Sequence, residues 1–140
     1  MPHAPASVTA EAVVQFLHHF EEVAMQEDFD LVRPMIDERA FFRFNDGDFV
    51  GLAAIQAVFE KTWRGDPTVK KTHFYLSDIV VLTTDHASAT ATYTYNWEGS
   101  QGSQVFKIQG RGTRVLVCEN GRFRIAHEHL SRFPVAPKTA

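Results

Sequence analysis

Two histidines, His127 and His129, stand two residues apart in an alternating stretch near the C-terminus. The alternation predicts a β-strand, on which both imidazoles point to one face. Two such imidazoles can exchange protons near neutral pH, ligate a metal ion, or act structurally through hydrogen bonds to a neighbouring strand or helix terminus. A metal ion would need further ligands, and although His73 and Asp78 are available, nothing in their spacing selects them.

Two arginines, Arg111 and Arg114, lie among apolar residues on the preceding predicted strand. A guanidinium in such surroundings must be paired, because an unpaired buried charge costs several kcal/mol. Arg114 therefore meets a ligand, or it forms an ion pair with Glu128 or with an acid of the first helix. Glu128 is expected on the face opposite the two histidines, so only a bulge would bring it to their site.

Aromatic side chains end a gradient of size along residues 87–97. One face of this predicted strand runs from alanines to Tyr93, Tyr95 and Trp97, a taper that suits the wall of a widening cavity. Tyr95 can donate a hydrogen bond to a developing enolate, and all three rings are equally compatible with an aromatic core. Trp63, near the end of a predicted helix, is expected at the pocket rim or in helix packing.

Proton transfer would also require a carboxylate base whose pKa is raised by burial. Asp46 and Asp48 belong to a strong turn sequence, whereas Asp78 lies inside a β-rich run, where a bulge or an inward carboxylate would explain it. The candidate catalytic residues are therefore His127, Asp78 and Tyr95. The candidate ligand-binding residues are Arg114, Arg111, His129, Trp97, Trp63 and Tyr93, and no metal ligand is assigned.

The elements that position these residues change character at residue 68. Before it, residues 13–24, 28–36 and 51–64 carry apolar side chains at helical spacing; after it, segments 68–83, 87–97, 104–117 and 122–130 alternate with period two. Three helices followed by long strands predict an α+β fold, with the helices packed in the concavity of a strongly curved antiparallel sheet. Gly110 and Gly112 favour a bulge or bend, which would let Arg111 replace Arg114. The expected organisation is a flexible arm over 1–8, one domain over 9–133 and a tail over 134–140.

Composition narrows the functional classes. The chain has 140 residues, is 44% hydrophobic, carries a net charge of −3 and contains twelve Phe, which must fill a core, a pocket or an interface. Its single Cys118 excludes an internal disulfide framework. No signal peptide, membrane span or run of basic residues is recognised, so a cytoplasmic protein without nucleic-acid or membrane partners is expected.

The C-terminal sequence carries a family resemblance. Thr113-Arg114-Val115 and Gly121-x-Phe123-x-Ile125-x-His127-x-His129-Leu130-Ser131 resemble the last hairpin of the SnoaL-like branch of the NTF2-like (nuclear transport factor 2) superfamily. The pattern is also similar to the association domain of calcium/calmodulin-dependent protein kinase II. The resemblance extends in element order over residues 9–133 and implies an NTF2-like cone, a homodimer and a cone-shaped pocket. In the kinase domain the arginine matching Arg114 meets carboxylate ligands, but two further arginines of that domain are replaced here by Thr94 and Leu130.

Two functions from different classes remain open. One is a homodimeric, non-catalytic module that binds a small hydrophobic or carboxylate-bearing molecule. The other is a cofactor-independent isomerase, polyketide cyclase or dehydratase, similar to ketosteroid isomerases, that works by proton transfer. No cofactor is expected for either. The Thr-rich face of residues 87–97 lacks charged side chains, which predicts that two sheets pack back to back through it.

Overall fold

The computed structural model describes residues 8–134. The predicted arm and tail therefore lie outside the described residues, apart from Val8 and Pro134. Val8, which was expected in the arm, is buried in the main hydrophobic core and so belongs to the packed domain.

Helices form where capping residues precede an apolar stripe. Helix α1 (Ala10–Ala24) begins at Thr9, whose side chain accepts a hydrogen bond from the Ala12 amide at 3.1 Å. Helix α2 (Phe29–Val32) is capped by Asp28 and continues into the short 3-10 helix η1 (Arg33–Met35). Helix α3 (Leu52–Arg64) lies between Gly51 and Gly65, both with positive φ.

Six strands form one sheet in the order β2-β1-β6-β5-β4-β3. Their bounds are β1 Ile36–Phe44, β2 Gly47–Val50, β3 Val69–Thr84, β4 Ser88–Gln101, β5 Gln104–Glu119 and β6 Arg122–Arg132. All neighbouring pairs are antiparallel except β1–β6, which is parallel. The predicted α+β cone is confirmed, and this parallel pair is the one strand direction that the sequence pattern did not indicate.

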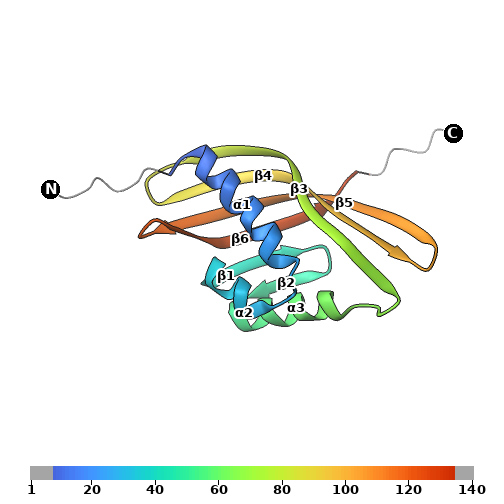
Figure 1. The fold of residues 1–140 in the computed structure, drawn as a ribbon. Helices are drawn as coiled ribbons and strands as arrows, with labels where there is room; N and C mark the ends of the chain where they lie inside the picture. The colour runs from blue at the N-terminus through green and yellow to red at the C-terminus, as the bar shows by residue number, and fades with distance from the viewer. Residues whose placement is uncertain (1–7, 135–140) are drawn as a thin grey trace.

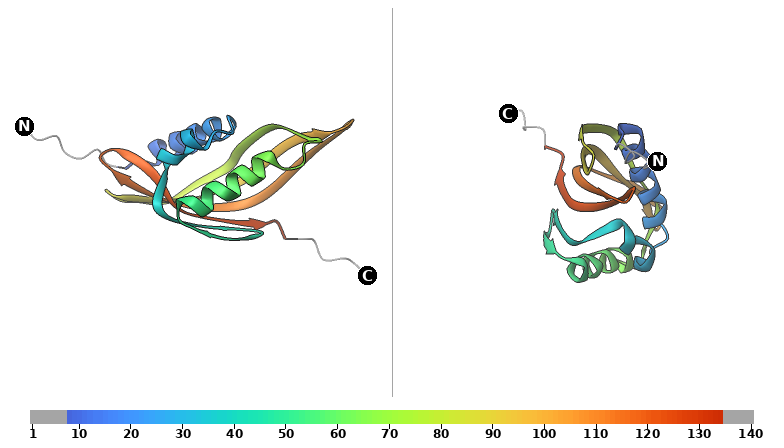
Figure 2. Two further views of the ribbon diagram at one scale, coloured as in Figure 1. Left: turned by 90° about the horizontal axis from the view of Figure 1, so that it is seen from below. Right: turned by 90° about the vertical axis from the view of Figure 1, so that its left-hand side faces the viewer.

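The helices lie on one side of the curved sheet. Figure 1 shows α1 running across the strands, while α3 lies beside β1 and β2, and the two views in Figure 2 show the sheet curling beneath them. We call the side of the sheet that faces α1 and α3 the concave face, and the opposite side the open face. Within residues 8–134, no helix has the length and apolar character needed to span a bilayer.

Of the register shifts in the sheet, two decide on which face predicted site residues lie. On β6, Ile125 and His127 oppose the adjacent residues Leu116 and Val115, so Ala126 is one extra residue. On β3, Ser77 and Val80 oppose Thr94 and Thr92, and Asp78 in this bulge has a φ of 52°. Because side chains alternate along a strand, each extra residue reverses the facing of the residues after it.

Candidate functional site

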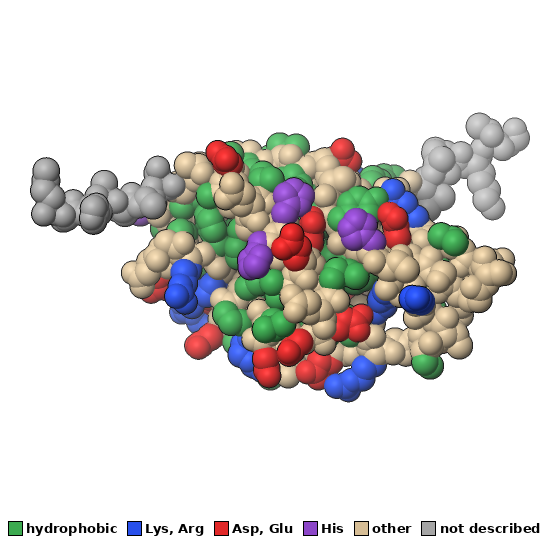
Figure 3. Space-filling view, viewed as in Figure 1, with side chains coloured by type: hydrophobic (Ala, Val, Ile, Leu, Met, Phe, Trp, Pro, Cys, Tyr) green, Lys and Arg blue, Asp and Glu red, His purple; other side chains and the backbone are tan. Residues whose placement is uncertain are grey.

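A cavity of about 380 Å³ lies between the helices and the concave face of the sheet. This volume is within the range of sites that hold small organic ligands. Figure 3 shows the surface hollowed beside the end of α3 and the start of β3. The cavity is lined by Phe20, Ala24, Phe44, Asn45, Asp46, Phe59, Thr62, Trp63, Phe74, Tyr93, Tyr95, Trp97, Ile108, Arg114, Glu128, Leu130 and Arg132.

One wall of the cavity is the inner face of β4. Tyr93, Tyr95 and Trp97 all line it, so the structure brings these three predicted residues together, with Trp63 contributed by α3. The tyrosine rings lie against the backbone of β5, where a Cβ atom on Gly110 or Gly112 would overlap them. The bulge expected at these glycines is absent, because the β4–β5 register passes them without a shift. Their role is to make room for the tyrosine rings.

A buried polar cluster forms the inner part of the cavity. Arg114 and Glu128 are 2% and 4% exposed, and the Arg114 Nε–H donates to Oε2 of Glu128. The Tyr93 hydroxyl donates to the same oxygen. The Arg114 guanidinium also lies over the rings of Phe20 and Tyr93, at 4.6 and 5.2 Å from their centroids. The anticipated ion pair between Arg114 and Glu128 is therefore present, and it lines the cavity.

The β6 bulge explains why Glu128 belongs to this cluster. Ile125 is buried against the core, and a regular strand would place His127 on the same face and Glu128 on the other. The extra residue Ala126 reverses this arrangement, so Glu128 enters the cavity and the histidines do not.

Burial and charge act together on the ionisation of this cluster. Burial lowers the pKa of Arg114, but the charge of Glu128 and the neighbouring Tyr93 raise it more, so the guanidinium keeps its charge. Burial is also the largest cause that raises the pKa of Tyr93 well above its usual value; Glu128 raises it further and Arg114 opposes the shift. The cluster thus holds one cation, one carboxylate and a neutral phenol.

The guanidinium has unused hydrogen-bonding capacity. Among residues 8–134, Nε is the Arg114 nitrogen found donating a hydrogen bond, and Nη1 is buried without a partner. A buried donor without a partner costs about 1–3 kcal/mol, more when it is charged. Both hydrogen bonds to Glu128 end on Oε2, so Oε1 is also without a bond from the described residues. Arg114 and Glu128 are the buried charged residues in the lining of the cavity.

The mouth of the cavity carries a second set of polar groups. The Asn45 side-chain amide donates to the Tyr95 hydroxyl at 3.2 Å, which ties the β1–β2 turn to β4. Asp46 from the same turn and Arg132 from the end of β6 also line the cavity.

The two predicted histidines lie on the open face. His127 is partly buried, and its Nδ1 lies 2.6 Å from the Phe41 carbonyl oxygen on β1. His129 is exposed, with its ring centroid 6.3 Å from that of His127. The hydrogen bond of His127 matches the structural alternative stated for it, and the lining of the cavity includes neither residue.

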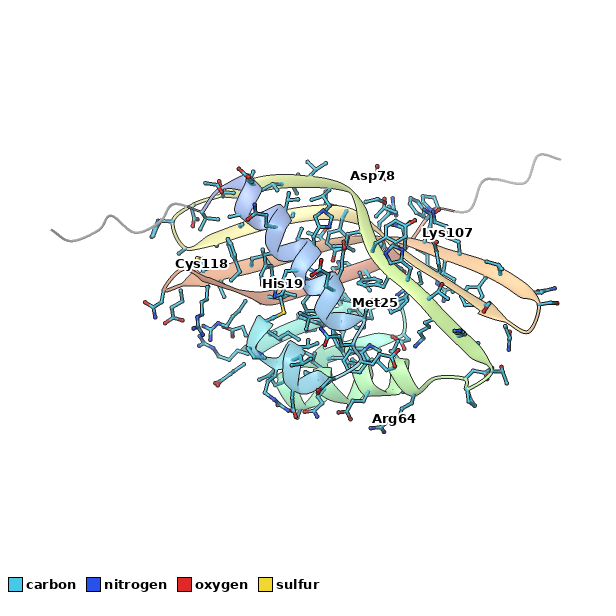
Figure 4. The ribbon with its side chains drawn as sticks, viewed as in Figure 1. His19, Met25, Arg64, Asp78, Lys107 and Cys118 are labelled. Carbon is cyan, nitrogen blue, oxygen red and sulfur yellow. The ribbon has the colours of Figure 1, made fainter. Side chains whose placement is uncertain are left out.

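Asp78 and Arg111 are also separated from the cavity. Asp78 is exposed at the bend of β3, where Figure 4 shows it at the margin of the molecule, and its Oδ2 accepts a hydrogen bond from Thr94 Oγ1 at 3.2 Å. Arg111 alternates away from Gly110, Gly112 and Arg114, and its Nη2 donates to the Arg132 carbonyl at 3.4 Å. Within residues 8–134, no three His, Cys, Asp or Glu side chains gather in an arrangement that would hold a metal ion.

Sequence reasoning missed several residues of the cavity. Glu128 was expected only as a structural partner of Arg114, and no site role was assigned to Asn45 or Arg132. The signal available for Glu128 was the need of Arg114 for a counter-charge. The bulge at Asp78 was one of two explanations offered for an aspartate inside a β-rich run, and the structure contains it, whereas Ala126 gave no such signal.

Comparison with known proteins gives one family. A family model described as a SnoaL-like domain matches residues 13–136. No curated protein matches the chain in sequence.

Several solved structures share the fold. Aln2 from a Streptomyces species aligns with a TM-score of 0.76 and 17% identity over 90% of this chain and 93% of its own. An NTF2-like superfamily protein from Salmonella enterica serovar Typhimurium aligns with a TM-score of 0.73 and 17% identity, over 91% of this chain and 92% of its own. The association domain of Caenorhabditis elegans calcium/calmodulin-dependent protein kinase II aligns with a TM-score of 0.72 and 16% identity, over 86% of this chain and 93% of its own. At these identities the likeness shows an NTF2-like fold alone.

Proposed function

The chain belongs to the SnoaL-like domain family, and from this premise we propose that it binds a small hydrophobic molecule with a polar group in the cavity of the concave face. The observation that carries the proposal is the cavity of about 380 Å³, whose walls are mainly aromatic and whose lining includes the buried Arg114–Glu128 pair. The aromatic walls supply apolar contact, and the guanidinium fixes the orientation of the ligand. Trp63, Tyr93, Tyr95, Trp97 and Arg114 are the proposed binding residues.

A cofactor-independent isomerase, cyclase or dehydratase is the second candidate. It is favoured by the convergence of Arg114, Glu128 and Tyr93 in a cavity with mostly apolar walls. In such a reaction the Glu128 carboxylate would remove a proton next to a carbonyl group, and Arg114 would stabilise the enolate oxygen. Turnover of a bound carbonyl compound that is lost in Glu128→Gln, with its binding retained, would favour this candidate over a binding module.

The open face is proposed to pack against a second copy of the chain. Paired residues across the sheet form a row of Val80, Thr92, Thr113, His129 and Arg43. In this row only Arg43 carries a permanent charge. Its Nε lies 3.0 Å from Oδ1 of Asp48, so the two side chains form an ion pair. Val80 and Leu82 on β3 are 52% and 56% exposed. A broad face of threonines and exposed aliphatic side chains is typical of a surface that is covered in an assembly.

Tryptophan fluorescence tests occupancy of the cavity. The chain contains two tryptophans, Trp63 and Trp97, and both line the cavity. Titration with steroids, aromatic polyketides and small carboxylates is expected to change their emission and raise the Tm for at least one class. Thr62→Phe, at an exposed lining position of α3, is expected to weaken the effect, whereas Ala53→Phe, on the same helix outside the lining, is expected to preserve it. A wild-type protein indifferent to every class would refute the proposed site.

Sedimentation tests the assembly. The wild-type protein is expected to sediment at twice the 15.8 kDa of one chain, and Leu82→Lys at the mass of one chain. Leu31→Lys, which changes an exposed leucine on α2, is the matched control and is expected to leave the assembly intact. A wild-type mass near 16 kDa would refute the proposed dimer.

A further inference from the structure

Strand β5 extends beyond the end of its neighbour β6. Their pairing ends at Arg132 of β6, which lies opposite Gly110 of β5. The six residues before Gly110, Gln104–Gln109, pair with β4 on one side, and among residues 8–134 no strand pairs with them on the other. Figure 1 shows the hairpin of β4 and β5 reaching past the end of β6. We call the unpaired side of Gln104–Gln109 the free β5 edge.

The sequence that follows β6 explains why the pairing stops. Phe133 and Pro134 come directly after Arg132, and in a continued register Pro134 would lie opposite Ile108. Proline has no backbone N–H to donate to a strand ladder, so it interrupts regular pairing at this point. The backbone groups of the free β5 edge are therefore available to another strand.

The two outer edges of the sheet are protected, whereas the free β5 edge is not. β3 has three register shifts, and its Leu76 N–H donates to Oε1 of Glu21 on α1 at 2.6 Å, while β2 is only four residues long. Bulges, cover by a helix and short strands are devices that prevent edge-to-edge association. Over Gln104–Gln109 the β4–β5 register has no shift, and Val105 and Ile108 are 85% and 55% exposed.

The composition of this segment favours pairing with its own copy. Gln-Val-Phe-Lys-Ile-Gln combines β-branched and aromatic residues with a single charge and contains neither Pro nor Gly, which is typical of strands that pair with identical strands. The single charge belongs to Lys107, whose Nζ lies 5.6 Å from the centre of the Tyr75 ring on β3. Lys107 thus reaches across β4 and away from the free β5 edge, where a lysine would otherwise oppose pairing.

We propose that the free β5 edge pairs with the same edge of a second copy of this chain, in antiparallel direction, so that the two sheets become continuous. With a twofold axis perpendicular to the sheet, the registers of greatest overlap are centred on Phe106 or on Lys107. The register centred on Lys107 places two like charges opposite each other, which is destabilising. The register centred on Phe106 places Val105 opposite Lys107 of the second copy, so the pair adopts this register. This contact is separate from both the cavity and the open face.

The concentration dependence of the sedimenting mass tests the pairing. Six residues from each copy make a smaller interface than stable dimers have, so the pairing is expected at higher concentrations than the packing of open faces. Leu82→Lys, in which the open faces are expected to be apart, should rise from the mass of one chain toward two as its concentration is raised into the millimolar range. The wild-type protein should rise from two chains toward four over the same range.

Substitutions at Val105 test the register with opposite signs. Val105→Lys places a lysine opposite Lys107 at two symmetric positions of the pair, and Val105→Glu places a carboxylate there. The dissociation constant of the edge pair is expected to rise at least about threefold in the first variant and to fall at least about threefold in the second. Val50→Lys, which changes a valine that is 71% exposed on β2, is the matched control and should leave the constant unchanged.

Three outcomes would overturn the inference. One is a mass that is independent of concentration in both the wild-type protein and Leu82→Lys. Another is the same dissociation constant for Val105→Lys and Val105→Glu, which would exclude the register centred on Phe106. The third is association that occurs only after residues 135–140 are removed, which would mean that the tail of the chain, and not a second copy, occupies the free β5 edge.

Discussion

The concave and open faces of strands β4–β6 use polar residues in opposite ways. On the concave face the polar groups are large, few and buried, and Arg114 and Glu128 are bound to each other. On the open face they are small or reachable by solvent, as Thr92, Thr113 and His129 are. Both sets come from the same strands, so alternation and the bulges alone sort them. The buried pair therefore lies in the cavity proposed to bind a ligand, whereas the threonines lie on the surface proposed to meet a second chain.

The largest effect that distinguishes the two faces is expected from breaking the buried ion pair. Arg114→Met leaves Glu128 as an unpaired buried carboxylate and is expected to lower the free energy of unfolding by about 3–5 kcal/mol. Glu128→Leu is expected to do the same, while the double variant recovers most of the loss because neither charge remains. Urea denaturation measures all three. A single variant that loses less than about 1 kcal/mol would contradict the burial of the pair.

A smaller loss of folding stability is expected when a side chain is added at the glycine beneath a tyrosine ring. Gly112→Ala adds a Cβ atom that overlaps Tyr93, and is expected to destabilise the protein by about 1–3 kcal/mol. The neighbouring change Thr113→Ala, on the open face, is expected to cost less than about 1 kcal/mol. Thermal unfolding of both variants checks this, and equal losses would mean that the two faces are packed alike.

Alkaline pH tests the burial of Tyr93. Its folded pKa lies well above the usual 10.0, whereas the unfolded phenol ionises near that value. The associated stability is therefore fully present below pH 10.0 and is lost as the pH rises toward the folded pKa. Denaturant titrations between about pH 9 and 11 are expected to show a steeper loss for the wild type than for Tyr93→Phe. Parallel slopes would count against a buried neutral phenol.

The smallest effect is expected on the open face. His127→Ala removes the contact with the Phe41 carbonyl and is expected to cost about 1 kcal/mol, while ligand affinity stays unchanged. His129→Ala is likewise expected to leave ligand affinity unchanged. Calorimetric titration and urea denaturation separate these outcomes. A marked loss of affinity in either variant would indicate that the ligand binds at the histidines and not in the cavity.

The sequence allowed the elements and one wall of the cavity to be predicted. The alternation of residues 87–97 correctly placed Tyr93, Tyr95 and Trp97 on the concave face, because β4 has no bulge against β5. The facing of His127 and Glu128 was not predictable, since it depends on one extra residue whose position is set by pairing with β5. Asp78 is the opposite case: an aspartate inside a β-rich run indicated a bulge or an inward carboxylate, and the structure has the bulge with the carboxylate exposed.

The central claim is that ligands bind on the concave face and not on the open face. The indole N–H resonances of Trp63 and Trp97 in a ¹H–¹⁵N correlation spectrum report on the first, and the imidazole resonances of His127 and His129 on the second. Titration with 2-naphthamide is expected to shift both indole signals and to leave both imidazole signals in place. Shifted imidazole signals with unchanged indole signals would contradict the account.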